Sequence, residues 1–255
     1  LPSTLEALFD YLAQDVLARQ SSETQRFLLA TSVLRQMDGP ACDHLLEVQG
    51  SATTLQELHE GGLFIVSLGD DAYRYHRLFR EFLQRELRQQ TSAADIAGLH
   101  ACAGDWFAQN GSIDEALYHF LAAGDTAAAV ALVAEHRYAL MNWVQWHSLD
   151  EYLHQFSPNI LDQYPNLLML RTWLLYYRGR WGELPAALQR LEAVLPQASL
   201  TSEEVDHLQG EISALCSLLY YHAVDPESDL AHAQQALEKT PPELWSVRIL
   251  ARLFM

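Results

Sequence analysis

Hydrophobic residues repeat at helical spacing through almost all of this 255-residue chain, and the pattern changes at one place, residues 63–75. Apolar side chains three or four positions apart predict helices before that point, over residues 3–20, 22–34, 40–48 and 52–60, with Ser51 as the cap of the last. Residues 63–66 then form a short apolar run, Gly69-Asp70-Asp71 has the composition of a turn, and residues 73–75 alternate like a returning strand. Residues 77–90 resume the helical pattern. Helices, one β-hairpin and a further helix are the element order of a winged-helix domain.

The charges of the chain argue against DNA binding by this domain. In a winged helix that reads DNA, the helix before the hairpin enters the major groove and carries Arg, Lys or Asn toward the base edges. Residues 52–60, ATTLQELHE, contain two glutamates and neither lysine nor arginine. The chain as a whole has 16 basic and 33 acidic residues, a formal net charge of −17, which repels phosphates. We therefore expect no direct DNA binding by this segment.

Basic residues are concentrated in one short stretch. Residues 61–88 hold five arginines against four acids, whereas residues 1–60 hold three arginines against nine acids, and residues 89–255 hold eight basic against twenty acidic residues. The five arginines are Arg74, Arg77, Arg80, Arg85 and Arg88. Together with His76, they are consistent with a surface that faces an anionic nucleotide. The competing interpretation, which the residues by themselves favour, is a helix-capping histidine in a solvated charge pattern with Arg77–Glu81 and Glu81–Arg85 ion pairs.

From residue 91 onward the pattern predicts pairs of helices joined by short turns. Gly104-x2-Phe107 and Ala116-x3-Phe120 have the spacing of the tetratricopeptide repeat, in which small residues lie where two helices approach each other. Weaker units follow at about 166–196 and 203–241, and their final prolines are 45 rather than 34 residues apart. The units are therefore irregular and tetratricopeptide-like. The helical pattern continues to the last residue, which we interpret as an array cut before its closing repeat.

No motif of catalysis or metal binding is recognisable. The chain lacks G-x4-G-K-[ST], G-x-S-x-G and H-E-x-x-H, and Cys42-Asp43-His44 is too tightly spaced for a zinc site. We expect no catalytic residue and no metal ligand. A helical enzyme that uses His100 or His119 as acid or base is the least favoured hypothesis.

The remaining composition predicts a cytoplasmic location. The three cysteines are odd in number and far apart, so we expect free, mostly buried thiols in a reducing compartment. No run of 18 apolar residues predicts a membrane span, and the first residues do not resemble a signal peptide.

Three aromatic residues are candidates for an effector or partner surface, namely Trp173, Tyr177 and Tyr221. Aromatic rings suit sugar-like ligands, because they stack on sugar faces while their polar ends form hydrogen bonds. Packing between repeat helices is the competing interpretation. Tyr177 and Tyr221 each follow another tyrosine, so we expect one member of each pair to face outward.

Several stretches resemble a known family. Residues 27–34 (FLLATSVL), 62–64 (GLF) and 75–83 (YHRLFREFL) are similar to the winged-helix segment of MalT-type regulators, large ATP-binding members of the LuxR group within the STAND signal-transducing ATPases. Residues 106–125 resemble the helical arm of these proteins, and residues 165–167 and 173–179 resemble the beginning of their sensor superhelix. The resemblance covers essentially the whole chain, is specific over 62–125 and is looser after 140.

The resemblance implies a mainly α fold in three parts. These are a winged helix with a small β-hairpin at 1–90, a helical arm with a tetratricopeptide-like hairpin at 91–160, and the start of a repeat superhelix at 161–255. Such proteins place an ATPase domain before these parts and a DNA-binding helix-turn-helix after them. In the family, a histidine after the wing contacts the phosphates of bound ADP in the resting state, and by position this is His76.

The resemblance also implies a function. The chain is expected to be the regulatory middle segment of an ATP-dependent transcriptional activator, with no enzymatic activity and no cofactor of its own. Its partners would be the ATPase domain of the same protein, which holds ATP or ADP, a small-molecule or protein effector on the repeats, and further copies in the active form. The alternative is a tetratricopeptide-like scaffold for protein partners without nucleotide involvement.

Overall fold

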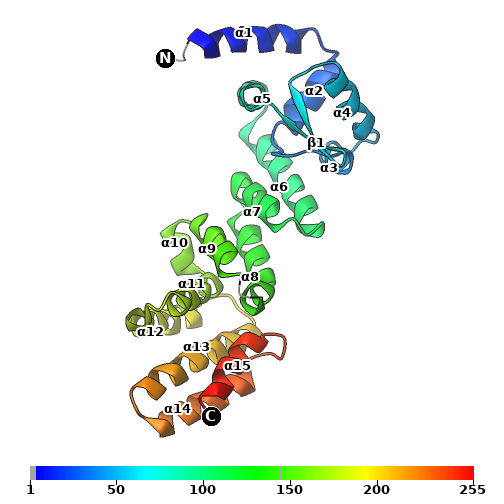
Figure 1. Cartoon of the computed structure of the whole chain (residues 1–255). Helices are drawn as coiled ribbons and strands as arrows, with labels where there is room; N and C mark the ends of the chain where they lie inside the picture. The colour runs from blue at the N-terminus through cyan, green and yellow to red at the C-terminus, as the bar shows by residue number, and fades with distance from the viewer. Residues whose placement is uncertain (1–3, 144) are drawn as a thin grey trace. The chain divides into compact units, whose positions relative to one another are not determined.

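The computed structural model describes residues 4–143 and 145–255, and the side chains from residue 11 onward within those ranges. The chain divides into two compact units, Leu1–Ala129 and Val130–Met255, which we describe separately. Both are built from helices, and the described residues contain one two-stranded antiparallel sheet (Figure 1). The predicted fold class, mainly α with a small hairpin, is confirmed. None of the described helices has the length and apolar character needed to cross a membrane.

The first unit begins with the winged helix. Its elements are α1 (Thr4–Ala18), α2 (Ser22–Thr31), α3 (Gly39–Leu46), α4 (Ser51–Glu60), β1 (Ile65–Gly69), β2 (Ala72–Tyr75) and α5 (Arg77–Gln90). The two strands pair antiparallel, with Ile65 opposite Tyr75. The predicted turn is confirmed, because Gly69, Asp70 and Asp71 all have positive φ angles, of 91°, 50° and 59°. Such φ angles match the twist of a tight hairpin, and Gly and Asp adopt them more readily than most residues.

The predicted cap of α4 is wrong by one residue. The N-cap is Gly50, whose φ of 92° places it in the left-handed region, and Ser51 is the first helical residue. The cap comes from another helix, since the carboxylate of Asp43 on α3 accepts a hydrogen bond from the backbone N–H of Ser51 at 2.9 Å. A tertiary contact has therefore replaced the local cap that the sequence suggested.

The core of the winged helix fixes where the hairpin ends. Tyr75 is buried, and its hydroxyl lies 2.7 Å from the hydroxyl of Thr31, which in turn donates to the carbonyl of Phe27 at 2.7 Å. Phe79 on α5 is fully buried and packs edge-on against the Tyr75 ring. These contacts anchor the residues on both sides of His76, so the position of that residue in the domain is well defined.

An antiparallel helix pair completes the first unit. It consists of α6 (Ala93–Gln109) and α7 (Ile113–Ala123). A Cβ atom built on Gly104 would lie 2.7 Å from the ring of Phe120. The prediction that a small residue lies at the closest approach of this pair is therefore confirmed.

The second unit consists of helix pairs. Its helices are the later part of α8 (Thr126–Asn142), α9 (Trp146–His154), α10 (Pro158–Gln163), α11 (Pro165–Tyr177), α12 (Leu184–Val194), α13 (Ser202–His222), α14 (Pro226–Lys239) and α15 (Trp245–Leu253), with 3-10 turns at Trp181–Glu183 and Leu195–Gln197. In the pair α13 and α14, as in the first unit, a glycine lies where the two segments approach most closely. A Cβ on Gly210 would lie 2.6 Å from the hydroxyl of Thr240, the C-cap residue of α14. Helical pairs in both predicted weaker units are thus confirmed, while the predicted boundaries at 90 and 160 stay a prediction.

Candidate functional site

His76 lies at the N-terminus of α5, directly after the hairpin. It occupies the N-cap position, its backbone N–H donates to the carbonyl of Phe64 at 2.7 Å, and its exposed side chain forms no cap hydrogen bond. His76 is therefore the capping residue of α5 by position, but its side chain does not supply the cap hydrogen bond. No acidic residue lies in the first turn of α5, so the partial positive charge of this helix end is not offset locally.

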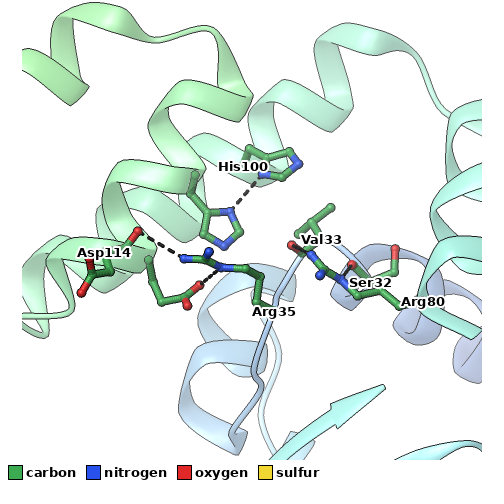
Figure 2. Close-up of polar contacts among 8 residues, drawn as sticks. Ser32, Val33, Arg35, Arg80, His100 and Asp114 are labelled. Carbon is green, nitrogen blue, oxygen red and sulfur yellow. Dashed lines mark hydrogen bonds and ion pairs between the residues drawn. The ribbon is translucent and has the colours of Figure 1, made fainter. Parts of the chain in front are cut away.

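The five arginines of residues 61–88 do not share one environment. Arg74, Arg77, Arg85 and Arg88 are exposed, and Arg77 pairs with Glu81 at 3.0 Å as the sequence predicted. Arg80 points into the domain instead. Its Nε donates to the carbonyl of Ser32 at 3.0 Å and its Nη2 to that of Val33 at 3.2 Å (Figure 2). Arg80 thus satisfies backbone carbonyls at the C-terminal end of α2. It is therefore not available as part of a surface that faces a nucleotide.

Arg35 connects the winged helix to the helix pair α6–α7 within the first unit. Its Nε donates to the carboxylate of Glu115 at 3.0 Å and its Nη2 to the carbonyl of Asp114 at 3.3 Å. The guanidinium also lies 4.4 Å from the ring centroid of Tyr118. Figure 2 shows Arg35 reaching toward Asp114 from the segment that follows α2. Arg35 therefore makes three contacts with one turn of α7. Because the side chain is partly exposed, each contact by itself contributes little to stability.

Two buried histidines lie beside this connection. The Nδ1 atoms of His100 on α6 and His119 on α7 are 3.0 Å apart, so one ring donates and the other accepts (Figure 2). Burial lowers the pKa of His119 to about 3, and the positive charges of His100, Arg35 and Arg80 act in the same direction. Burial, and then Arg80, also lower the pKa of His100. A neutral pair with such a low proton affinity is a poor general base, which weakens the hypothesis of a helical enzyme.

We call Arg35, Arg80, His100, Glu115 and His119 the junction cluster. Its members come from the segment after α2, from α5 and from both helices of the α6–α7 pair. The cluster is polar, largely hydrogen-bonded and located where two substructures of the first unit meet. These contacts hold the winged helix and the α6–α7 pair against each other within the first unit.

The three aromatic candidates of the second unit have different surroundings. Trp173 is 1% exposed, and its Nε1 donates to the carboxylate of Glu211 at 2.8 Å. It therefore belongs to the packing between helices and not to an accessible surface. Tyr177 is 40% exposed and stacks on Trp146, while Tyr221 is 55% exposed with its ring 4.9 Å from that of Phe254.

The adjacent tyrosine pairs only partly follow the prediction. In the first pair, Tyr176 is half-buried and Tyr177 is exposed, as expected from adjacent positions on a helix. In the second pair, Tyr220 and Tyr221 are both exposed. Tyr220 is partly covered all the same, since its ring stacks on that of His232 of α14 at 5.2 Å.

Comparison with known proteins identifies the winged helix of the first unit. Residues 13–95 match the MalT winged helix domain family. These residues are a MalT winged helix domain. His76, Arg35 and Arg80 all lie within it, and the α6–α7 pair follows it in the chain.

The similarity to MalT regulators extends over nearly the whole chain. The HTH-type transcriptional regulators MalT of Yersinia enterocolitica, Serratia proteamaculans and Cronobacter sakazakii are 31%, 32% and 30% identical to it over 246, 247 and 247 residues. Each alignment covers 96% of this chain and 27% of the relative, so the chain spans about a quarter of the length of these proteins. The similarity supports a role in transcription regulation.

The sequence did not predict the contacts that join the MalT winged helix to the α6–α7 pair. Arg35 and Glu115 are 80 positions apart, and nothing in their spacing indicates that they meet. The available signal was compositional, since Arg35 is one of three basic residues among the first 60. His100 and His119 have the spacing of neighbours across a helical hairpin, and the register of that hairpin is the signal that indicates their contact.

Proposed function

We propose that this chain is the regulatory middle segment of a MalT-type, ATP-dependent transcriptional activator. It relays effector binding on the helical repeats to the nucleotide state of an ATPase domain that lies outside these residues. The observation that carries the proposal is the junction cluster, through which the winged helix and the first helix pair of the arm hold each other in one arrangement.

The nucleotide side of the relay rests on His76. Its side chain is exposed at the N-terminus of a 14-residue helix, where the backbone N–H groups and the helix dipole favour an anion. Arg74 is exposed as well and adds positive charge, whereas the charge of Arg77 is already paired with Glu81. A phosphate of ADP held by the ATPase domain would find a hydrogen-bond donor and a favourable potential at this place.

The effector side requires two states of the whole protein. In the closed state, ADP contacts His76 and the protein stays a monomer; in the open state, ATP is bound and copies associate. An effector shifts this balance only if it prefers the open state, since equal affinity for both states changes nothing. The junction cluster would couple the arm to the winged helix, because a movement of the arm must displace either Arg35 or its partners on α7.

The test is His76→Ala in the full-length regulator, with transcription of a target promoter measured without added effector. Losing a hydrogen bond to a charged phosphate costs about 1.5–3 kcal/mol. If the contact exists only in the closed state, the ratio of closed to open protein falls roughly 10- to 150-fold. We therefore expect a marked rise in basal transcription.

The control is Arg88→Ala, which removes an exposed side chain from the last turn of the same helix. We expect this variant to keep the basal transcription of the unchanged protein. A thermal melt of both variants distinguishes release of the closed state from loss of folding, because unfolding would lower transcription and melting temperature together. Basal transcription that stays low in the His76→Ala protein at unchanged melting temperature would contradict the proposed role of His76.

The alternative function is a scaffold that binds protein partners without nucleotide. The exposed rings of Tyr177 and Tyr221 on the second unit favour it, since exposed tyrosines are common at protein interfaces. The two functions differ in one measurable respect. A scaffold would act identically in the presence of ADP and ATP, whereas the relay requires that its activity depend on which nucleotide is present.

A further inference from the structure

A groove of about 750 Å3 lies in the second unit, between α9, α10, α11 and α12. Its volume falls within the range of sites for small molecules, roughly 300–1,000 Å3. None of the groove-lining residues belongs to the junction cluster or to the three aromatic candidates.

The floor of the groove is largely apolar, and small side chains on one of its walls leave space inside it. On α11, Leu168, Thr172 and Leu175 lie at helical spacing on the face that lines it. On α12 the lining residues are Ala186 and Ala187, whose short side chains fill little of the space. The larger residues of α12 are directed away from the groove into the core, and these are Leu184, Leu188 and Leu191.

Positively charged side chains are concentrated at the rim of the groove, although the second unit as a whole is acidic. Residues 130–255 contain eight basic and fifteen acidic residues, and half of the basic ones line this groove. They are Arg171, Arg178, Arg180 and Arg190. Three carboxylates pair with them: Asp150 with Arg178, Glu183 with Arg180, and Asp162 with both of the others. The four guanidinium groups of the rim are therefore paired with only three carboxylates.

Arg171 and Arg190 share a single carboxylate. The Nη2 atom of Arg190 donates to Oδ2 of Asp162 at 2.6 Å, whereas Nη1 of Arg171 lies 3.7 Å from Oδ1, beyond hydrogen-bond distance. A guanidinium carries five N–H donors in a planar fork that suits a carboxylate or phosphate. Most of the donors of Arg171 are therefore available to an anion placed beside Arg190.

The geometry points to a binding site for a small amphipathic anion. Its carboxylate or phosphate head binds Arg171 and Arg190, and its short apolar chain lies on Leu168, Leu175 and the two alanines of α12. This site goes beyond the proposed function, because it is formed by residues of the second unit alone and stands whether or not the chain acts as a relay. A sugar ligand fits less well, since the lining residues include neither tryptophan nor tyrosine for ring stacking.

The test is calorimetric titration of the 255-residue chain with octyl phosphate, below the concentration at which it forms micelles. Inorganic phosphate and n-octanol, titrated separately, represent the head and the chain alone. Octanoate, titrated in parallel, reports whether a carboxylate or a phosphate head is preferred. We expect octyl phosphate or octanoate to bind at least tenfold more tightly than either half-ligand.

Three variants assign the binding to the groove. Arg171→Gln and Arg190→Gln should each weaken it on the order of tenfold or more, because each removes a charged hydrogen-bonding group. Ala186→Phe should weaken it by filling the floor without changing any charge. The matched control is Arg252→Gln, which removes the same charge from an exposed position on α15 and should leave the affinity unchanged.

Circular dichroism and a thermal melt of each variant show whether its fold is intact. Three results would overturn the inference: no heat of binding with either amphipathic anion, equal affinity for n-octanol, or the same loss of affinity in the Arg252→Gln protein. The second would mean that the arginines contribute nothing, and the third that only overall charge matters.

Discussion

Replacing Arg137 by methionine should destabilise the second unit strongly, because it removes one half of a buried ion pair. The Nη2 atom of Arg137 lies 2.7 Å from Oε1 of Glu211, and both side chains are almost completely buried. The other oxygen of Glu211 accepts the hydrogen bond of the Trp173 indole. Without Arg137, the carboxylate of Glu211 remains buried with a single neutral donor.

The magnitude follows from what each variant leaves behind. Breaking a buried ion pair at one partner costs about 3–5 kcal/mol, since an uncompensated charge stays in the interior. Arg137→Met should lower the free energy of unfolding by about 3 kcal/mol, the smaller end of this range. The loss is limited because the substitution also removes Nη1, a buried group that has no hydrogen-bond partner among the described residues. Glu211→Gln should cost more, nearer the upper end of this range, because it leaves the charge of Arg137 buried without a partner. The double variant leaves no buried charge, retains an acceptor for Trp173 and should recover most of the loss.

The assay is urea unfolding followed by tryptophan fluorescence. Five of the six tryptophans of the chain lie in residues 130–255, so the signal reports mainly on the second unit. With a denaturant dependence of about 2 kcal/mol per molar urea, a loss of about 3 kcal/mol lowers the unfolding midpoint by roughly 1.5 M. A midpoint shift of less than about 0.5 M in either single variant, or a double variant no more stable than the single ones, would contradict a stabilising role of this ion pair.

Four further predictions concern the rest of the chain. Gly104→Ala should destabilise the first unit by about 1–3 kcal/mol in a thermal melt, because its Cβ would lie 2.7 Å from Phe120; Gly98→Ala in the same helix, with nothing within 4 Å of its Cβ, should instead stabilise it by about 0.5–1 kcal/mol. The stability of the first unit should fall as the pH drops from about 6.5 toward 3, since the pKa of His119 is lower in the folded state than in the unfolded one, and His119→Asn should flatten this dependence in acid titrations followed by circular dichroism. The isolated chain should hydrolyse no ATP, and calorimetry should detect no submicromolar binding of ADP, because these residues contain no phosphate-binding loop. A gel shift at physiological salt should show no sequence-selective retention of DNA, given the net charge of −17 and the acidic helix before the hairpin; selective retention would contradict this.

Local structure was largely predictable from the sequence. The bounds of α5 agree with the predicted 77–90, and the hairpin turn lies at Gly69–Asp71, because hydrophobic period and turn composition are properties of adjacent residues. The resemblance of residues 75–83 to the MalT-type segment correctly indicated the winged helix found over residues 13–95. Both kinds of signal are contained in short stretches of the chain.

Contacts between distant segments were not predictable in the same way. The sequence grouped Arg80 with its neighbouring arginines, yet the fold turns its guanidinium toward carbonyls 47 and 48 positions earlier in the chain. It placed Trp173 among possible ligand-facing residues, and the acceptor that holds it inside, Glu211, lies 38 positions later. Helical spacing shows which residues share a face, but not which neighbour that face meets. The roles proposed for His76, Tyr177 and Tyr221 stay predictions.

The way in which α5 closes the end of α2 has a consequence for local opening of the winged helix. Arg80 and Gln84 both donate to the carbonyl of Ser32, so the last turn of α2 keeps its terminal hydrogen bonds only while α5 is docked. Fraying of one helix therefore exposes backbone groups of the other, and the two should open as a single cooperative unit. In native-state hydrogen exchange, the protected amides of the α2 end and of the first half of α5 would then share one opening free energy, and Arg80→Met would lower it for both helices together.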